Sequence, residues 1–321
     1  MKIGFFVLAA VIALLFICFG IGYAFVFLII RRQGTLQSPE TGAESSELLE
    51  PTGNALWAYN IPKFKPFREL PFESADIISF DGLRLHADFL RGESGTKVTM
   101  IFCHGYKSEA AFDFAAMYDF YRSLGYNLVY LNMRAHGKSG GKYIGFGVLD
   151  RFDVQSWAKK VAELFPDTSI FLHGMSMGAA SILQSADLEL DPAVCGIIAD
   201  CGFSSTNEVF RNLVGGLYHL PATPFVDIFE AVNRMTAGYG FTDADSVRSM
   251  EKSRLPLAYI CGDCDRYVPL DMAMRIYNAC VQDKVLLIAE GAGHAASFMT
   301  ENEKYRNLIT EFINTHRKED E

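Results

Sequence analysis

The sequence predicts an α/β fold in which a mostly parallel sheet of about eight strands is covered by helices on both faces. Three observations predict it. Short, wholly apolar runs alternate with stretches of helical length, as expected for parallel strands buried on both faces. Asp81-Gly82 separates the first two strand-like runs, which is a hairpin signal and adds antiparallel strands at one edge. Half of the 321 residues are hydrophobic and 21% are charged, which suits one large core and excludes a disordered chain.

After the hairpin, each apolar run leads into a predicted helix. The run "KVTMIFC" precedes a helix near residues 110–124, "YNLVYLN" one near 152–165, and "SIFLHG" one near 177–188. The run "VCGIIAD" comes next. Later, "PLAYICG" precedes a helix near 270–280 and "DKVLLIAE" precedes the last helix, near 297–315. Strands that alternate with helices in this way pair in parallel.

The segment 203–255 interrupts this alternation. It contains no convincing strand, only helical stretches broken by "HLPATPF" and "AGYGFTDAD". An insertion of this size between two strands is usually functional in a compact domain. We therefore expect a helical cap over the carboxyl ends of the strands, with peripheral helical padding as the alternative.

Residues 1–32 predict a transmembrane anchor. Ile3 to Ile30 contain no charged residue, and as a helix they would span roughly 40 Å against a hydrocarbon core of ~30 Å. A cleavable signal peptide has a shorter apolar region and a small-residue cleavage site. We expect a single-pass protein of the cell membrane. Lys2 on one flank against Arg31 and Arg32 on the other weakly favours a cytoplasmic position for the domain that follows, and the opposite orientation stays open.

Residues 33–54 are polar, acidic and rich in Gly, Ser, Thr and Pro, which predicts a flexible linker. The globular domain would then take residues 55–321. It begins with "WAYNIPKFKPFREL", where aromatic and basic residues alternate. This composition suits a membrane interface, and equally an arm packed on the domain.

Charge and cysteine usage narrow the function. A formal net charge of −9 argues against a nucleic-acid partner, which requires a basic face. The seven cysteines show no framework spacing, and "CGDC" has no second pair to complete a zinc site. We expect buried free thiols, no metal and no organic cofactor. Free thiols mildly favour a reducing compartment.

The pattern G-x-S-x-G occurs twice, around Ser139 and around Ser176. Ser176 directly follows the strand "SIFLHG" and directly precedes a helix. This strand–turn–helix setting is the one in which a sharp turn exposes a nucleophilic serine. Ser139 lies in a glycine-rich stretch without a helix ahead of it. We therefore predict that Ser176 is the nucleophile and that Ser139 belongs to a loop.

A nucleophilic serine needs a base and an acid that orients the base. The strand "PLAYICG" ends at "GDCDRYVP", which offers Asp263 and Asp265, and "DKVLLIAE" ends at "EGAGHAAS", which offers His294. These positions share the sheet edge of Ser176. Two backbone N–H groups should form the oxyanion hole, one from Met177 and one from Tyr106 in "HGYKS".

Taken in order, "HGYKS", "MRAHGKSGGKYIGFGVLDRFD", "LHGMSMGAAS", "GDCDRYVP" and "GAGHAAS" resemble the α/β-hydrolase family. Within it, the chain is similar to bacterial membrane-anchored serine esterases and serine-aminopeptidase-like hydrolases, over roughly residues 76–316. The resemblance implies the α/β-hydrolase fold. It also implies that the acid is the Asp of a D-x-x-V-P pattern, which is Asp265 rather than Asp263.

The resemblance implies two-step acyl transfer by Ser176, His294 and Asp265, with the amides of Met177 and Tyr106 binding the oxyanion. We expect a carboxylic-ester hydrolase that acts near the membrane on lipid-like or other hydrophobic substrates. One alternative is an aminopeptidase or amidase that holds the substrate amine with a cap carboxylate, from Asp227, Glu230, Asp243 or Asp245. The other is a non-catalytic scaffold tethered to the membrane.

Overall fold

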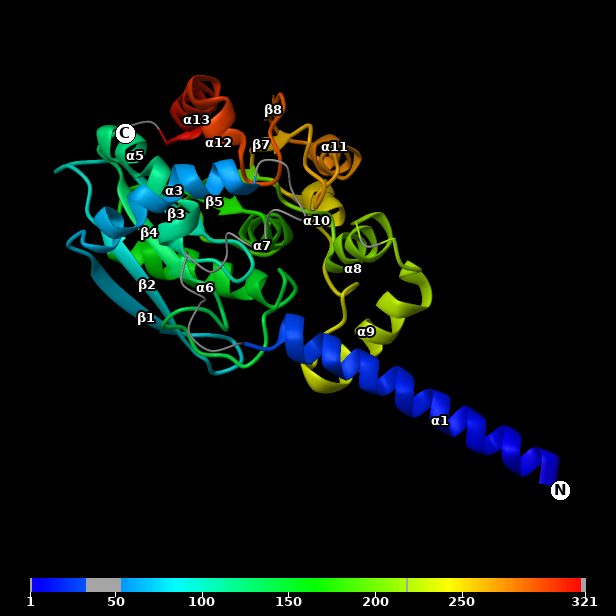
Figure 1. The fold of residues 1–321 in the computed structure, drawn as a ribbon. Helices are drawn as coiled ribbons and strands as arrows, with labels where there is room; N and C mark the ends of the chain where they lie inside the picture. Colours follow the sequence, from blue (N-terminus) through cyan, green and yellow to red (C-terminus); the bar gives the residue numbers. More distant parts are fainter. Residues whose placement is uncertain (1, 33–52, 218, 319–321) are drawn as a thin grey trace.

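The computed structural model describes residues 2–32, 53–217 and 219–318, and in these residues eight strands form one sheet (Figure 1). The strands are β1 (Glu73–Ile78), β2 (Arg84–Leu90), β3 (Val98–Cys103), β4 (Asn127–Asn132), β5 (Ser169–Met175), β6 (Val194–Asp200), β7 (Leu257–Gly262) and β8 (Lys284–Ala289). Their order across the sheet is β1-β2-β4-β3-β5-β6-β7-β8. The predicted linker lies outside the described residues, apart from Gly53 and Asn54, which begin a helix.

The directions of the strands determine at which edge of the sheet their carboxyl ends meet. β1 pairs with β2, and β2 with β4, in antiparallel fashion, whereas every pair from β4 across to β8 is parallel. The carboxyl ends of six strands therefore meet at one edge, where ligands bind in open α/β sheets. The mostly parallel sheet with an antiparallel edge confirms the predicted fold class.

Alternate side chains of the strands point to two separate cores. On β3, Ile101 and Cys103 belong to one core, and Met100 and Phe102 to the other. The first core is covered by α6 (Asp150–Leu164), α7 (Met177–Ser185) and α11 (Leu270–Ala279), and the second by α3 (Gly53–Arg68), α4 (Ala110–Asp113), η2 (Ala115–Met117), α5 (Tyr118–Ser123), α12 (Ser297–Thr300) and α13 (Asn302–His316).

The helix expected near 110–124 is divided into three short pieces. Phe114 has φ −121° and ψ −7°, which interrupts the helix between α4 and η2. Its side chain is 1% exposed, and its ring centroid lies 4.9 Å from that of Phe102 on β3. Burial of this ring against the sheet therefore outweighs the continuity of the helix.

The aromatic and basic segment after the linker is an arm on the domain. Its residues form most of α3, with Pro62 and Pro66 inside the helix. Phe64 and Phe67 are each 5% exposed, and the ring of Phe67 meets that of Tyr130 edge-on at 5.1 Å. The structure thus favours the packed arm over the membrane interface.

The interrupting segment is helical, as predicted. Between β6 and β7 the described residues form α8 (Thr206–Arg211), η3 (Asn212–Leu217), α9 (Ala222–Thr236) and α10 (Ser246–Lys252). We call the described part of residues 203–255, which carries these helices, the cap. The Asn212 side chain donates to the backbone carbonyls of Arg266 and Tyr267, at 2.8 and 2.9 Å. Glu208 pairs with Arg275 of α11. The cap is therefore fastened to the loop that follows β7.

The N-terminal helix differs along its length. It comprises α1 (Lys2–Phe25) and the π-helical turn η1 (Val26–Ile30). Residues Phe5–Ile30 have a mean hydropathy of 2.9, which is apolar and long enough to cross a membrane. Phe16 is 73% exposed, whereas Val26 and Ile30 are 2% and 0% exposed. Figure 1 shows the helix projecting from the domain and entering it beside α9. Among the helix residues whose burial is described, those that belong to the hydrophobic core lie at the carboxyl end.

A buried ion pair lies just after the carboxyl end of β4 and provides a stability prediction. Arg134 is 1% exposed and donates to both carboxylate oxygens of Asp153, at 2.6 and 2.7 Å. Replacing Arg134 by methionine leaves the Asp153 carboxylate buried without its partner. We expect a loss of about 3–5 kcal/mol in the free energy of unfolding. The matched control is Arg84→Met, because Arg84 bonds Asp76 with its side chain 69% exposed, and its loss should be about 0–1 kcal/mol. Denaturant melts of both variants test this, and equal losses would contradict it.

Candidate active site

Ser176 lies in the turn between β5 and α7. Its φ of 52° and ψ of −113° are strained for a residue with a side chain. Its backbone N–H donates to the carbonyl of Asp200 at 2.9 Å, which fixes the turn to the end of β6. This geometry lifts the hydroxyl clear of the backbone at the carboxyl edge of the sheet.

The two glycines of this G-x-S-x-G are required by packing. A Cβ on Gly174 would lie 2.5 Å from the backbone of Gly178 and Ala179. A Cβ on Gly178 would overlap the carbonyl of Cys103, at the end of β3. Neither position can hold a side chain, because strand and helix approach each other too closely there.

The structure brings Ser176, His294 and Asp265 together. His294 Nε2 lies 2.8 Å from Ser176 Oγ, and His294 Nδ1 lies 2.7 Å from Asp265 Oδ2. The other carboxylate oxygen, Oδ1, accepts the backbone N–H groups of Tyr267 and Val268, each at 2.8 Å. In the neutral imidazole whose Nδ1 donates to this carboxylate, Nε2 is the acceptor for the serine proton. The three side chains form one hydrogen-bonded chain.

The rejected acid, Asp263, is bonded elsewhere. Its Oδ1 accepts the backbone N–H of Gly291 at 2.7 Å, at an exposed position. Asp263 therefore closes the turn after β8, while Asp265 is the carboxylate beside His294.

His294 is half-buried between Ser176, Asp265 and Cys201. Burial lowers its pKa, but the Asp265 carboxylate raises it, and the net result lies well above the ordinary value. Cys201 Sγ lies 3.9 Å from His294 Nε2, and burial raises the pKa of this thiol to about 12, so it is protonated at neutral pH. These three side chains are close enough to share a metal ion. Because Asp265 and Ser176 already engage both imidazole nitrogens, the geometry suits proton transfer rather than metal binding.

The HGYKS loop (residues 104–108) lies against Ser176. A Cβ on Gly105 would be 3.4 Å from Ser176 Cβ. Met177 is the first residue of α7, and the first N–H groups of a helix have no acceptor within that helix. The structure thus brings the HGYKS loop and the amino end of α7 next to Ser176.

Two neutral histidines shape the HGYKS loop. In His104 and in His136, Nδ1 donates to a backbone carbonyl, at 2.9 and 2.8 Å. Nε2 of His104 accepts the N–H of Met133 at 3.1 Å, and Nε2 of His136 accepts the N–H of Lys107 at 3.0 Å. Burial lowers the pKa of His104 to about 3 and that of His136 to about 4, so neither ring is charged. Both rings hold backbone rather than substrate.

Asp113 of α4 fixes the loop from its other side. Oδ2 accepts the Gly105 N–H at 2.6 Å, and Oδ1 accepts the Ser108 hydroxyl at 2.7 Å. Burial raises the pKa of Asp113 to about 6, and these two hydrogen bonds oppose the rise. Asp113 is a positioning residue, because its contacts reach the site through the HGYKS backbone.

A pair of substitutions at Asp113 tests this role. Asp113→Ala removes both acceptors and should lower kcat roughly 10–100-fold, since a displaced oxyanion donor costs about that much. Asp113→Asn keeps an oxygen for the Gly105 N–H and should retain most of the activity. Steady-state kinetics on folded protein compare the two. Equal losses in both variants would show that the charge matters rather than the loop geometry.

The second G-x-S-x-G has no chemistry of its own. The Ser139 hydroxyl donates to the carbonyl of Asn132 and accepts the N–H of His86 at 2.9 Å, and the residue is 1% exposed. The AHGKSGG loop (residues 135–141) is thereby tied to the sheet edge. Ser139 is structural, as predicted.

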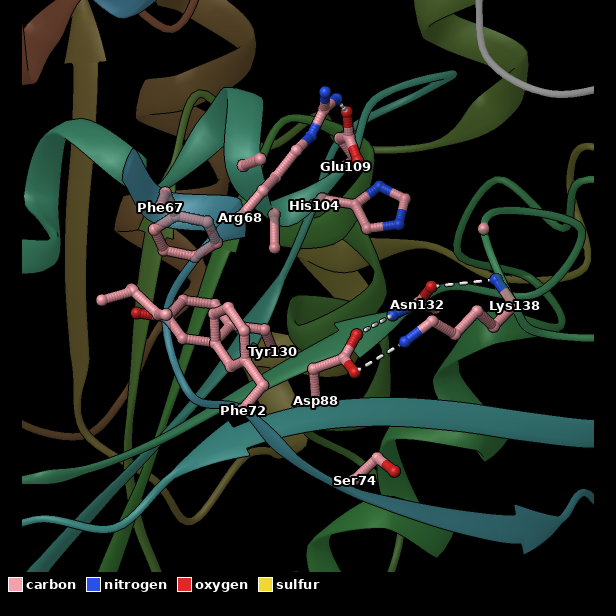
Figure 2. A pocket seen from close by; sticks show the side chains of 14 residues that line it. Phe67, Arg68, Phe72, Ser74, Asp88, His104, Glu109, Tyr130, Asn132 and Lys138 are labelled. Atoms are coloured by element: carbon pink, nitrogen blue, oxygen red, sulfur yellow. Dashed lines mark hydrogen bonds and ion pairs between the residues drawn. The ribbon is translucent and has the colours of Figure 1, made fainter. Parts of the chain in front are cut away.

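A pocket of about 490 Å³ lies beside the site, between α3 and the β2–β4 edge (Figure 2). The imidazole of His104 borders it, but none of Ser176, Asp265 and His294 does. Figure 2 shows Lys138 bonded to Asp88 at 2.9 Å, and Arg68 bonded to Glu109. The pocket is lined by paired charges and lies off the reaction centre.

Two contributions to the site are not predicted by the sequence: Asp113 and His136. The "MRAHGKSGG" stretch suggests a loop, but nothing in it indicates that a histidine bonds the Lys107 amide. Asp113 looks like one of many acidic residues on a helix. The site residues that the sequence does predict, by contrast, lie in short recognisable motifs that follow predicted strands.

Comparison with known proteins supports the fold and a hydrolase. Residues 94–223 match the model of the family described as serine aminopeptidase, S33. This match covers Tyr106 and Ser176 but ends before Asp265 and His294. The Bacillus subtilis protein YqkD is 29% identical over 223 residues, which cover 68% of this chain and 72% of YqkD.

Solved structures share the fold. The Pyrococcus furiosus esterase Pf2001 superposes with a TM-score of 0.61 at 22% identity, over 76% of this chain and 91% of the esterase. The Pyrococcus horikoshii acylaminoacyl peptidase gives a TM-score of 0.54 at 19% identity, over 80% of this chain and 44% of the peptidase. The sheet order and these matches show the α/β-hydrolase fold. The family model and the similar solved structures support a hydrolase.

Proposed function

We propose that this protein is a membrane-anchored serine hydrolase that cleaves carboxylic esters through an acyl-enzyme. The observation that carries the proposal is the hydrogen-bonded chain from Ser176 Oγ through His294 to Asp265, with links of 2.8 and 2.7 Å. A serine hydroxyl bonded to a base that an acid orients is an activated nucleophile.

The geometry supports a two-step acyl transfer. His294 Nε2 takes the hydroxyl proton as Ser176 Oγ attacks the ester carbonyl, and Asp265 stabilises the imidazolium. The backbone N–H groups of Tyr106 and Met177 stabilise the oxyanion. His294 then protonates the leaving alcohol, and a water molecule, deprotonated by the same imidazole, releases the acid from Ser176.

The cap carboxylates favour the ester over the aminopeptidase alternative. An aminopeptidase needs an acidic group to hold the substrate amine. Asp227 pairs with Arg211, and Asp243 pairs with Arg234 at 2.7 Å. Glu230 accepts the Thr242 hydroxyl at 2.8 Å, and Asp245 caps α10. All four candidates are engaged in holding the cap together.

The N-terminal helix supports the membrane assignment. Apolar side chains such as Phe5, Phe6 and Phe16 are exposed, and Val26 and Ile30 near the carboxyl end are buried in the domain. Removal of the helix as a signal peptide would take part of the core with it. We therefore propose residues 1–32 as a single-pass anchor with the domain facing the cytoplasm, residues 33–54 as linker, 55–321 as hydrolase domain, and 203–255 as cap. A lipid-like ester suits an enzyme held at the bilayer.

The test uses the full-length chain in detergent micelles. Graded p-nitrophenyl esters and aminoacyl nitroanilides are offered in parallel, and labelling by a fluorophosphonate is measured. We expect ester turnover with labelling at Ser176 and a preference for medium or long acyl chains. Turnover of the anilides alone would replace the proposal by a peptidase. No turnover of either substrate class and no labelling by the fluorophosphonate would favour a non-catalytic scaffold.

A further inference from the structure

We infer that the carboxyl end of the N-terminal helix, residues 25–32, is a working part of the active site: it positions the HGYKS loop and the cap. The inference rests on the proposed hydrolase activity and goes beyond anchoring. A tether needs no particular contact with the domain. Residues 25–32 contact the HGYKS loop, the cap and the loop after β4.

The first contact is with the HGYKS loop. Tyr106 Oη donates to the carbonyl of Ile29 at 2.9 Å, and Lys107 Nζ donates to the carbonyl of Leu28, also at 2.9 Å. The last carbonyls of a helix lack donors within it and form the negative end of its dipole, so a hydroxyl and an ammonium are suitable partners. Tyr106 also supplies the backbone N–H proposed for the oxyanion. The helix end therefore holds Tyr106, whose backbone N–H must be correctly positioned to bind the oxyanion.

The second contact is with the cap. The ring of Phe25 stacks on that of Phe229 in α9, with 4.0 Å between centroids and 4° between planes. It also meets the ring of Phe210 of α8 edge-on at 5.2 Å. One turn earlier, a Cβ on Gly22 would lie 2.7 Å from Val232 Cγ2 of α9. The helix and α9 thus approach as closely as a glycine allows.

The third contact is with the chain after β4. The Arg32 N–H donates to the Lys142 carbonyl, and the Ile144 N–H donates to the Ile30 carbonyl, each at 2.8 Å. The Arg32 guanidinium donates to the carbonyls of Gly137 and Ser139, at 2.6 and 2.5 Å. This segment carries His136, which accepts the Lys107 N–H. The helix end therefore holds the HGYKS loop both directly and through the AHGKSGG loop.

Through these contacts the proposed membrane helix is connected directly to the loop and cap beside Ser176. Residues with a lipid-facing position, such as Phe16, are exposed, whereas the buried end lies against the cap and the oxyanion loop. Without residues 25–32, the aromatic face of the cap and the Tyr106 hydroxyl would lose these partners. A soluble fragment that begins at residue 55 should therefore be a poor enzyme even when it is folded.

The experiment compares two glycines of the same helix in full-length protein reconstituted in phosphatidylcholine nanodiscs. Gly22→Leu should push the helix from α9, because its side chain meets Val232. Gly20→Leu is the matched control, since a Cβ there meets nothing within 4 Å. Tyr106→Phe is the second variant and removes only the hydroxyl that bonds the Ile29 carbonyl. The active fraction is titrated with a fluorophosphonate, so kcat refers to active sites.

We expect kcat per active site to fall about 10-fold or more in Gly22→Leu and Tyr106→Phe, with KM little changed, because an oxyanion donor acts in the transition state. Affinity for a trifluoromethyl ketone, which presents an oxyanion to Ser176, should fall in parallel. A purely structural role would lower the active fraction alone. Wild-type kcat and ketone affinity in both variants, or an equal loss in Gly20→Leu, would overturn the inference. A wild-type chain that neither turns over esters nor reacts with fluorophosphonate would overturn the proposed function first, and this inference with it.

Discussion

Replacing Ser176 by alanine is expected to lower kcat/KM for esters by roughly 10⁴–10⁶-fold, the range seen when a triad nucleophile is removed. The hydroxyl at 2.8 Å from His294 Nε2 is the nucleophile that the geometry offers, and alanine has no atom to replace it. Alanine and serine both carry a Cβ, so the backbone strain at this position is the same in the variant and in the wild type. Ester hydrolysis by purified full-length variant, measured against wild type, gives the ratio.

The control for Ser176→Ala is Ser139→Ala, since both serines satisfy G-x-S-x-G. The Ser139 hydroxyl bonds the backbone of Asn132 and His86. Its loss leaves two buried groups unpaired and should cost about 1–3 kcal/mol in unfolding free energy. Turnover per folded molecule should stay at the wild-type value. Loss of turnover at Ser139 with retention at Ser176 would refute our choice of nucleophile.

The nucleophile turn was predictable because its determinants are local. A strand, a five-residue G-x-S-x-G and a helix follow one another within about 20 residues, and the glycines are forced by contacts with the nearby backbone. His294 was predictable because it follows the last strand, whose carboxyl end must share the edge of Ser176. The choice between Asp263 and Asp265 was different. The residues offered both, and only the D-x-x-V-P resemblance separated them.

What the sequence could not predict depends on contacts between distant segments. Pro62 and Pro66 argue against a helix, yet α3 forms because Phe64 and Phe67 gain burial on the domain. Asp113 is a positioning residue only because the HGYKS loop turns back toward α4. The N-terminal helix is uniformly apolar, so no pattern in it distinguishes exposed Phe16 from the docked ring of Phe25.

The second large effect is expected from Asp265→Asn, with a loss in kcat of roughly 10³–10⁴-fold. The carboxylate accepts the proton of His294 Nδ1 at 2.7 Å, which leaves Nε2 free to act as base. An asparagine can turn its amide nitrogen toward Nδ1, and the imidazole then takes the other tautomer, with its proton facing Ser176. The base is lost although the fold is kept.

The pH profile separates this explanation from simple misfolding. Asp265 raises the pKa of His294, so the active, neutral imidazole of the wild type is lost as the pH falls through a value above 6.5. Without the carboxylate, that pKa falls, and the acid limb of the residual activity should move to lower pH. Asp263→Asn is the matched control, because its Oδ1 can still accept the Gly291 N–H. It should keep both the wild-type kcat and the wild-type limb, and the reverse result would make Asp263 the acid.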